Sequence, residues 1–356
     1  MALQLGVDAW NLRGDRRGIG RYTREILRHW TAGHASAVRI SLLVPERLTW
    51  MSRRRYLAAM ADAGFEVRFR GGDLRRLDAV WYPWNGMSWI ASRPSVATLH
   101  DASPFSLAPS DAALREREQR PFRCALKHAR TIITDSQFSK NELVSHLEVE
   151  PHRIRVVPLG VGEPFRSASP SRRTSDPGAP PYVLFVGEAE PRKGLPALFE
   201  AMALLHRSGC EVELRTVGAT GKYPLPQPPP GIRVSHLGWI DDAALAKQYA
   251  SAAVMAYPSL YEGFGLPILE AMAAGAPVIA ADIPVARETG GDAAVYVAPG
   301  DPRTLAAAIG SLLDDRERAE QLRALGQARA RLFGWDATAQ KTLAVIDAAV
   351  RQTEGG

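Results

Sequence analysis

The sequence predicts an α/β protein of two domains, each built on a parallel sheet with helices on both faces. Short apolar runs typical of buried strands alternate with helical patterns along almost the whole chain. Such alternation favours parallel sheets, because two parallel strands are usually joined by a helix that covers the sheet. The length of 356 residues also exceeds one ordinary core and suits two domains.

The first half contains strand patterns separated by helical ones. A helix is expected at 20–30, and SKNELVSHL (139–147) reads as another helix, which a capping box of Ser139 and Glu142 would open. Strands are expected at 3–9, 38–45, 65–70, 79–83, 95–100 and 131–136.

The second half begins the alternation again. Strands are expected at 182–187, 211–218, 232–238, 252–259, 276–281 and 293–299. Helices are expected at 195–209, 241–252, 266–275 and 301–315. A proline near the first turn and a glycine after the end support the helix at 195–209.

A linker separates the two halves. Residues 166–181, RSASPSRRTSDPGAPP, are rich in proline, serine, glycine and arginine and carry almost no large apolar side chain. We therefore expect an N-terminal domain at 1–165, a linker at 166–181 and a C-terminal domain at 182–334. An amphipathic helix is expected at 335–352.

Composition excludes several classes of protein. Cys124 and Cys210 form neither a disulfide framework nor a metal spacing, so a reducing compartment is expected. The first residues do not read as a signal peptide, and no apolar run approaches the ~18 residues of a membrane span. These features predict a cytoplasmic protein.

Positive charge is concentrated in the first half. Residues 1–165 hold 25 Lys and Arg against 17 Asp and Glu, whereas the remainder holds 19 against 21. The basic half could contact an anionic membrane surface, a phosphorylated acceptor or nucleic acid, and LTWMSRRRYLAAM (48–60) could form a basic membrane-surface helix. Compositional bias and a solvated basic helix are the alternatives, and no nucleic-acid-binding motif is present.

Two glutamates flank a glycine-containing loop in SLYEGFGLPILEAM, residues 259–272. Pro267 suits the first turn of a helix, so Glu262 and Gly263-Phe264-Gly265 form a loop that enters a helix at Leu266. A helix N-terminus exposes free N–H groups and partial positive charge, which bind anions such as phosphate. Glu262 before this site and Glu270 after it predict a ligand with hydroxyls on both flanks, as in a sugar nucleotide.

Other candidate site residues follow predicted strands. Arg192 and Lys193 in GEAEPRKGL (187–195) suit a diphosphate and would stabilise its departure, although a solvated turn is the alternative. His100, with Asp101, ends the strand at 95–100, where ligands of parallel sheets bind, but a lone histidine there is usually structural. WYPWNGMSW (81–89) offers tryptophan faces and Asn85 to an acceptor, or simply packs in the core.

Much of the chain resembles family 4 of the retaining glycosyltransferases of the GT-B fold. Residues 259–288, SLYEGFGLPILEAMAAGAPVIAADIPVARE, resemble the signature of this family, in which two glutamates stand eight residues apart. Further segments resemble the family in the same order: RRGIGRYTREIL, VATLHDASPF, ITDSQFSKNEL, RVVPLGVGEPF, YVLFVGEAEPRKGL and VSHLGWIDDAAL. The resemblance implies two Rossmann-like, doubly wound domains that face each other across a cleft, with the C-terminal helix returning to the first domain.

The resemblance also implies roles for individual residues. Glu262 would contact the donor sugar near the reacting carbon, and Glu270 would hydrogen-bond the ribose. The backbone around Gly265 and Leu266 would hold the distal phosphate, with Gly263, Phe264 and Leu237 in the same donor site. Gly18 and Gly20 would belong to a loop, Gly18 to Arg21, that closes over the phosphates. Lys193 matches the family's pyrophosphate lysine, and His100 would hydrogen-bond the sugar.

One departure from the family lies beside this lysine. Glu188 stands where many members carry arginine directly after the strand's glycine, and Arg192 would supply that charge instead.

The implied activity is retaining transfer of a mannose- or glucose-type sugar from a nucleotide diphosphate sugar to a glycan or lipid-linked acceptor. GDP-mannose is the favoured donor, and bacterial surface polysaccharide or glycolipid synthesis the favoured setting, with possible peripheral contact at the inner face of the plasma membrane. No metal or other cofactor is expected, because cations already face the diphosphate and the histidines show no ligand spacing. A phosphorylase or hydrolase of the same fold and a non-catalytic nucleotide-sugar-binding scaffold are the alternatives.

Overall fold

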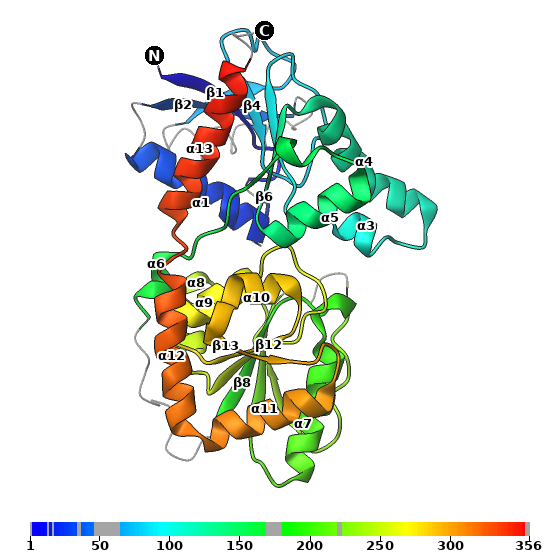
Figure 1. Cartoon of the computed structure of the whole chain (residues 1–356), viewed down its shortest axis with the longest axis vertical. Coiled ribbons are helices and arrows are strands. Elements are labelled where there is room, and N and C mark those ends of the chain that lie inside the picture. Colours follow the sequence, from blue (N-terminus) through cyan, green and yellow to red (C-terminus); the bar gives the residue numbers. More distant parts are fainter. Residues whose placement is uncertain are drawn as a thin grey trace, which may run out of the picture. The chain divides into compact units, whose positions relative to one another are not determined.

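The computed structural model describes residues 2–12, 14–15, 18–33, 37–45, 65–168, 180–218 and 223–352. The chain divides into two compact units, each built on its own parallel sheet (Figure 1). The first unit comprises Met1–Leu159 and Trp335–Gly356, and the second comprises Gly160–Gly334. The predicted α/β class with two doubly wound parallel sheets is therefore confirmed, whereas a cleft between the domains stays a prediction.

Within the described ranges, the sheet of the first unit has seven strands in the order β3-β2-β1-β4-β5-β6-β7, and all neighbours are parallel. The strands are β1 (Leu3–Asp8), β2 (Val38–Val44), β3 (Glu66–Phe69), β4 (Ala79–Tyr82), β5 (Ser95–Thr98), β6 (Thr131–Thr134) and β7 (Ile154–Val156). The winding direction reverses between β1 and β4, which are neighbours in space although β2 and β3 separate them in sequence. Ligands of such sheets bind outside the carboxyl ends of the strands at this point.

The C-terminal helix packs on the first unit. Among the described residues, the helices of this unit are α1 (Gly18–Gly33), α3 (Ser103–Ser106), α4 (Ala112–His128), α5 (Gln137–Leu147), the short 3₁₀ helix η1 (Pro151–Arg153) and α13 (Trp335–Arg351). The red helix α13 lies beside the blue α1 in Figure 1. Trp30 of α1, fully buried, donates a hydrogen bond from Nε1 to the Ala339 carbonyl oxygen of α13 at 2.9 Å.

The sheet of the second unit is also parallel and has six strands among the described residues, in the order β10-β9-β8-β11-β12-β13. Its strands are β8 (Tyr182–Val186), β9 (Glu213–Val217), β10 (Arg233–His236), β11 (Val254–Tyr257), β12 (Val278–Ala281) and β13 (Ala294–Val297). The winding reverses between β8 and β11, so the loops after these two strands form the expected ligand position of this unit.

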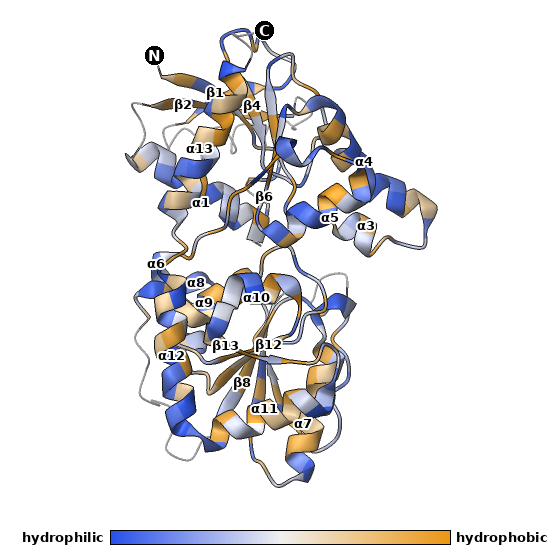
Figure 2. Ribbon diagram, viewed as in Figure 1, coloured by the Kyte–Doolittle hydropathy of each residue, from blue (hydrophilic) through white to orange (hydrophobic). Residues whose placement is uncertain are grey.

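Helices cover both faces of the second sheet. They are α6 (Glu163–Arg166), α7 (Leu195–Arg207), α8 (Asp242–Ser251), α9 (Leu266–Ala273), α10 (Pro284–Gly290), α11 (Pro302–Asp314) and α12 (Arg316–Ala330), with the 3₁₀ helices η2 (Pro191–Lys193) and η3 (Gly291–Ala293). Figure 2 shows apolar residues along the strands and long hydrophilic stretches on α12. One core cluster joins β8, β9 and β11 to α7 and α11, which holds the carboxyl edge of the sheet in place.

The boundary between the domains lies earlier than we predicted. The first unit ends at Leu159, not at 165, because the residues that follow pack on the second unit. Val161 donates its backbone N–H to the Phe333 carbonyl oxygen at 3.1 Å. The buried ring of Phe165 lies edge-on to that of Tyr249, with centroids 6.0 Å apart.

Two local features of the first unit differ from the prediction. The strand β7 was not predicted, because its three residues are too few for a periodic pattern. The helix α5 begins at Gln137, two residues before the predicted start, and Ser136 is its N-cap. The Ser136 hydroxyl accepts a hydrogen bond from the Ser139 N–H at 2.9 Å, so Ser139 is the capped residue and not the cap.

Two predicted segments lie outside the described residues. The basic helix at 48–60 falls wholly in the undescribed range, and the linker at 166–181 falls there for residues 169–179. In the part of the chain that is described, none of the helices combines the length and the hydropathy needed to cross a bilayer.

The hydrogen bond between α1 and α13 gives a test of the C-terminal packing. Trp30→Phe removes the N–H donor and leaves a void in a fully buried site, so we expect the free energy of unfolding to fall by about 2–3 kcal/mol. Trp239→Phe is the control, because Trp239 is 50% exposed in the second unit and should change stability by less than about 0.5 kcal/mol. Chemical denaturation followed by circular dichroism measures both, and equal losses would contradict the packing described.

Candidate active site

Three charged side chains from two loops meet at the carboxyl ends of β8 and β11. Arg192 and Lys193 belong to η2, which follows β8, and Glu262 lies in the loop between β11 and α9. Gly194 lets the two loops approach each other, because a Cβ there would stand 2.2 Å from the Pro258 carbonyl oxygen. The predicted cation pair and the predicted glutamate are therefore brought together at the point where the winding reverses.

Glu262 bridges the two cations with its two carboxylate oxygens. Its Oε1 accepts a hydrogen bond from Lys193 Nζ at 2.5 Å, and its Oε2 accepts one from Arg192 Nη1 at 2.9 Å. Arg192 also donates to the Tyr261 carbonyl oxygen at 3.0 Å and to Glu190 at 2.6 Å. The side chains of Arg192, Lys193 and Glu262 are 23%, 14% and 10% exposed, so these charges are screened less than those of surface pairs.

The cations keep Glu262 ionised. Burial alone would raise the pKa of Glu262, but the charges of Lys193 and Arg192, together with hydrogen bonds from Lys193 and Ser259, lower it below its ordinary value. A carboxyl with a lowered pKa in the folded state contributes stability above its unfolded pKa, and this contribution is lost as the pH falls through the folded pKa. Glu262 is thus a carboxylate at neutral pH and suits hydrogen bonding to hydroxyl groups.

The loop after Glu262 leads into the N-terminus of α9. Gly265 is the N-cap of this helix, with a φ of +92° that favours glycine. Thr289 of α10 donates a hydrogen bond to the Phe264 carbonyl oxygen, and the buried Phe264 ring lies edge-on to Phe333 at 6.0 Å. The loop is therefore held in place beside N–H groups that have no partner within the helix, an arrangement that suits a phosphate.

Two other residues of this unit, Glu270 and Leu237, were predicted to contact the donor. Glu270 is one turn into α9, is 3% exposed, and accepts a hydrogen bond from the Tyr249 hydroxyl of α8 at 3.2 Å. Leu237 follows β10 and is 36% exposed, but β10 stands two strands away from β8.

The predicted site residues His100, Gly18 and Gly20 belong to the first unit. His100 follows β5 and is buried, and both of its ring nitrogens face oxygen atoms. Nδ1 lies 2.7 Å from Asp135 Oδ2, and Nε2 lies 3.1 Å from the Pro83 carbonyl oxygen. This geometry differs from the predicted contact with a donor sugar, because each nitrogen already has a protein partner.

The protonated form of His100 uses both of these partners. Burial alone would lower the pKa of His100, but the charge and hydrogen bond of Asp135 and the Pro83 carbonyl raise it above its ordinary value. A histidine with a raised pKa contributes stability below its unfolded pKa, and this contribution is lost as the pH rises through the folded pKa. Asp135, which the sequence analysis did not single out, thus fixes the histidine ring.

The two glycines of the first loop have different surroundings. A Cβ on Gly20 would stand 2.0 Å from the Asp15 carbonyl oxygen, so the start of α1 can pack on its own loop only with glycine there. A Cβ on Gly18, the first residue of α1, would meet no atom of the described residues within 4 Å. Packing within the unit therefore explains Gly20 but not Gly18.

The carboxyl ends of β1 and β4 gather tryptophans around a buried acid. Asp8 accepts a hydrogen bond from Arg70 at 2.5 Å, and its carbonyl oxygen accepts one from Trp84 Nε1 at 2.5 Å. Trp10 lies edge-on to Trp84 at 6.1 Å and is 49% exposed. In the predicted segment 81–89, Trp81 packs in the core, as the alternative reading required, while Trp84 lies at this edge.

Sequence reasoning missed three members of this group: Asp8, Arg70 and Trp10. Each lies within one residue of the carboxyl end of a predicted strand, 3–9 or 65–70, and that position is the signal that could have found them.

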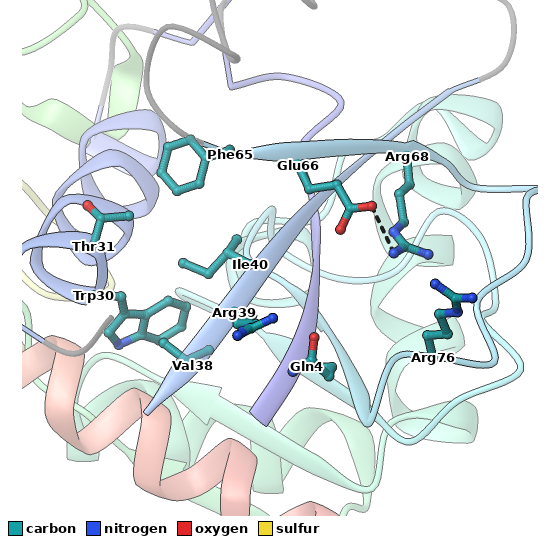
Figure 3. Close-up of a pocket in the computed structure, with 10 residues that line it drawn as sticks. All are labelled: Gln4, Trp30, Thr31, Val38, Arg39, Ile40, Phe65, Glu66, Arg68 and Arg76. Atoms are coloured by element: carbon teal, nitrogen blue, oxygen red, sulfur yellow. Dashed lines mark ion pairs between the residues drawn. The ribbon is translucent and has the colours of Figure 1, made fainter. Parts of the chain in front are cut away.

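A separate cavity opens at the opposite, amino edge of the first sheet (Figure 3). Its volume is about 660 Å³, and the guanidinium groups of Arg39, Arg68 and Arg76 line it together with Glu66. Arg68 pairs with Glu66 at 2.8 Å, which leaves the lining with more positive than negative charge. The cavity lies at the starts of β1, β2 and β3, so it is distinct from the carboxyl edge of that sheet.

Two family models match the chain, one on each unit. Residues 16–162 match the model described as Glycosyltransferase Family 4, and residues 180–315 match the model described as Glycosyl transferases group 1. The predicted family is therefore confirmed by one match in each of the two units.

Curated relatives include mannosyltransferases. The O-antigen chain mannosyltransferase B of Escherichia coli is 31% identical over 264 residues, which are 70% of this chain and 69% of that enzyme. The MMP alpha-(1->4)-mannosyltransferase of Mycolicibacterium hassiacum is 33% identical over 233 residues, which are 62% of this chain. The match spans 54% of the length of that second enzyme, or about half.

Solved structures share the fold over nearly the whole chain. Sucrose-phosphate synthase from Thermosynechococcus elongatus aligns with a TM-score of 0.71 at 20% identity, covering 96% of this chain and 97% of that one. Anabaena HepE in complex with UDP and glucose aligns with a TM-score of 0.72 at 18% identity, covering 98% of this chain and 100% of that one. Together with the family models and the E. coli relative, these likenesses establish that the chain belongs to family 4 of the glycosyltransferases with the GT-B fold.

Proposed function

We propose that this glycosyltransferase moves a hexosyl group, with retention of configuration, from a nucleoside diphosphate sugar to a hydroxyl of a glycan or lipid-linked acceptor. The observation that carries the proposal is the cluster of Glu262, Arg192 and Lys193 beside the N-terminus of α9. Two fixed cations and a helix N-terminus suit a diphosphate, and an ionised carboxylate beside them suits the hydroxyls of a sugar.

The cations act on the leaving group. As the bond from the anomeric carbon to the phosphate oxygen breaks, negative charge grows on the β-phosphate. Arg192 and Lys193 stabilise this increased charge more strongly than they stabilise the smaller negative charge of the bound donor, and this difference lowers the barrier. The backbone N–H groups at Gly265 and Leu266 hold the distal phosphate. Many family members carry an arginine at the position of Glu188, and in this chain Arg192 supplies that positive charge instead.

Retention follows from transfer on one face of the sugar. The acceptor oxygen bonds to the anomeric carbon on the side from which the diphosphate leaves, and the acceptor proton passes to a diphosphate oxygen. No strong protein base and no covalent glycosyl-enzyme are needed. Glu262 therefore orients the donor sugar and is not a nucleophile.

The remaining donor contacts are assigned to the nucleoside and to the first loop. Glu270 hydrogen-bonds the ribose hydroxyls, and its buried contact with Tyr249 supports a fixed orientation. Leu237 borders the nucleoside, and Gly18 leaves room for the loop that it opens to approach the phosphates. Packing within the first unit does not explain why residue 18 is a glycine, and this supports the assignment of Gly18 to the phosphate loop.

The choice of sugar rests on relatives. Two curated relatives are named mannosyltransferases, which supports a mannosyl donor such as GDP-mannose. The E. coli relative is named for the O-antigen chain, which supports a surface-polysaccharide setting. The assay panel should include UDP-glucose, because HepE has been solved in complex with it.

We propose that transfer needs no metal. The usual task of a divalent cation at a diphosphate sugar is to neutralise the leaving group. Arg192 and Lys193 supply two positive charges at the corresponding position, and their half-buried side chains are held by Glu262 and Glu190. Activity in the presence of EDTA is the corresponding measurement.

Substitution of Glu262 and Lys193 tests the site. Glu262→Ala should lower transfer by at least about 100-fold, because a group that orients the reacting sugar is lost, while nucleoside diphosphate affinity changes by less than about threefold. Lys193→Ala should weaken both transfer and diphosphate binding, because a phosphate contact is lost. Steady-state transfer assays and calorimetry measure these two quantities.

Glu211→Ala is the control for these variants. Glu211 is 80% exposed and forms a surface pair with Arg233, so transfer should stay within about twofold of wild type. If the Glu262→Ala variant transferred sugar at the wild-type rate, the assignment of the active site would be wrong. Turnover of donor without an acceptor alcohol would indicate a hydrolase or phosphorylase, and diphosphate binding without any turnover would indicate a scaffold.

The exposed tryptophan of the first unit tests the acceptor assignment. We propose that Trp10 stacks on the acceptor at the carboxyl ends of β1 and β4. Trp10→Ala should lower kcat/KM for the acceptor by about 3–10-fold and leave the KM for the donor unchanged. Leu325→Ala removes another half-exposed apolar side chain, from α12, and should change neither value. Equal effects on acceptor and donor would contradict the assignment.

The arginine-lined cavity supports peripheral contact with an anionic membrane. Arg39 and Arg76 are exposed at its rim, so Arg39→Ser combined with Arg76→Ser should weaken binding to vesicles that contain phosphatidylglycerol by at least about fivefold. Arg316→Ser combined with Arg318→Ser, on exposed positions of α12, removes the same charge from the second unit. Co-sedimentation measures binding, and equal losses for both double variants would show that the contact is not specific to the cavity.

A further inference from the structure

A buried tyrosine hydroxyl without a partner lies at the end of β11. Tyr257 is the last residue of this strand and is 2% exposed. Its hydroxyl finds no hydrogen-bond partner among the residues that the structure describes. A buried polar group that is left unpaired destabilises the folded protein, so such a group requires an explanation.

Other tyrosines of the same unit show how such hydroxyls are usually satisfied. Tyr182 donates to the Gln248 carbonyl oxygen at 2.7 Å, and Tyr296 donates to the Gly291 carbonyl oxygen at 2.7 Å. Tyr249 donates to Glu270 at 3.2 Å. The unpaired hydroxyl of Tyr257 is therefore not a general feature of the tyrosines in this unit.

The hydroxyl lies next to the loop that carries Glu262. A Cβ on Gly265, the N-cap of α9, would stand 3.6 Å from the Tyr257 hydroxyl oxygen. Burial, then the negative charge of Glu262 and the approach of its carboxylate, hold the pKa of Tyr257 well above its ordinary value, while Arg192 and Ser259 act in the opposite direction. The hydroxyl is thus a protonated donor close to a carboxylate whose two oxygens are both engaged by Arg192 and Lys193.

Binding of the donor would change the partners of Glu262. When a diphosphate draws Arg192 and Lys193 towards itself, the buried carboxylate of Glu262 loses charged donors. A buried carboxylate needs hydrogen-bond donors in order to stay ionised and fixed in orientation. Tyr257 holds an unused donor at the end of β11, the strand that leads into this loop, five residues before Glu262 in the sequence.

We propose that Tyr257 is a positioning residue for Glu262: its hydroxyl donates a hydrogen bond to the Glu262 carboxylate when a diphosphate engages Arg192 and Lys193. The inference rests on the proposed function, because it needs a diphosphate at the two cations. The free protein leaves the hydroxyl unpaired, and ligand binding relieves this cost. The site is thereby biased towards the bound arrangement, in which Glu262 faces the donor sugar.

Tyr257→Phe removes only the hydroxyl and tests the proposal on the free protein first. Since the oxygen is unpaired there, the melting temperature should be unchanged or higher. Tyr182→Phe is the matched control, because it removes a paired hydroxyl at the start of β8 and should lower the melting temperature. A fall for Tyr257→Phe as large as the fall for Tyr182→Phe would overturn the proposal, since the hydroxyl would then have a partner in the free protein.

Calorimetry with GDP and UDP on four proteins tests the link to Glu262. Tyr257→Phe should weaken binding of the diphosphate by about tenfold in the otherwise wild-type chain, because the buried Glu262 carboxylate then has no replacement donor and holds Arg192 and Lys193 back from the diphosphate. In the Glu262→Ala background the same substitution should change affinity by less than about twofold, because its acceptor is absent. Such a dependence on Glu262 would not arise from a purely structural role.

Three results separate the possible failures. Equal weakening in both backgrounds would mean that Tyr257 bonds the nucleotide directly, and it would overturn the positioning role. No weakening in either background would overturn it as well, while transfer by the wild-type chain would leave the proposed function standing. If the wild-type chain bound neither diphosphate and transferred no sugar, the proposed function itself would fail.

Discussion

The carboxylate of Glu262 holds two cations that come from another loop, and this contact ties the carboxyl ends of β8 and β11 together. Nearby residues position the backbone of these loops. Gly194 allows the loops to touch, and Thr289 fixes the carbonyl of Phe264. Charges this close and this shielded from water compensate one another, so the loss of one member leaves the remaining charges without a protein counter-charge. The same set presents the features that a diphosphate sugar needs: fixed positive charge, free N–H groups and an ionised acid.

The parallel sheets explain why the cluster stands where it does. A reversal of winding leaves a gap between the connections of two neighbouring strands, and in the second unit that gap lies between β8 and β11. The first unit repeats the arrangement between β1 and β4, where Asp8, Arg70 and the tryptophans gather. The two edges differ in chemistry. One combines cations with a glycine loop and a helix N-terminus, and the other combines aromatic faces with one buried ion pair, which suits a donor at the first and an acceptor at the second.

Much of this could be predicted from the sequence, because most strands of the second unit are apolar and glycine or proline residues mark the ends of its elements. The glycines and Pro267 reveal the loop and the helix start, so Glu262 and Lys193 could be placed at a sheet edge. Features that depend on tertiary contacts could not be predicted. Ser136 and Ser139 compete for one cap, and the choice depends on where the chain leaves β6. The partners of His100, Asp135 and the Pro83 carbonyl, come from separate segments, and the unpaired state of Tyr257 is visible only when its surroundings are known.

Calorimetric titration of UDP, GDP, ADP and dTDP into the wild-type chain, first with EDTA and then with magnesium, tests the central claim most directly. If Arg192, Lys193 and the N-terminus of α9 form a diphosphate site, one nucleotide should bind with a stoichiometry of one in EDTA, and magnesium should add little. That result would also identify the base of the donor. Absence of binding to all four nucleotides by a folded sample, or binding that appears only with magnesium, would contradict the account.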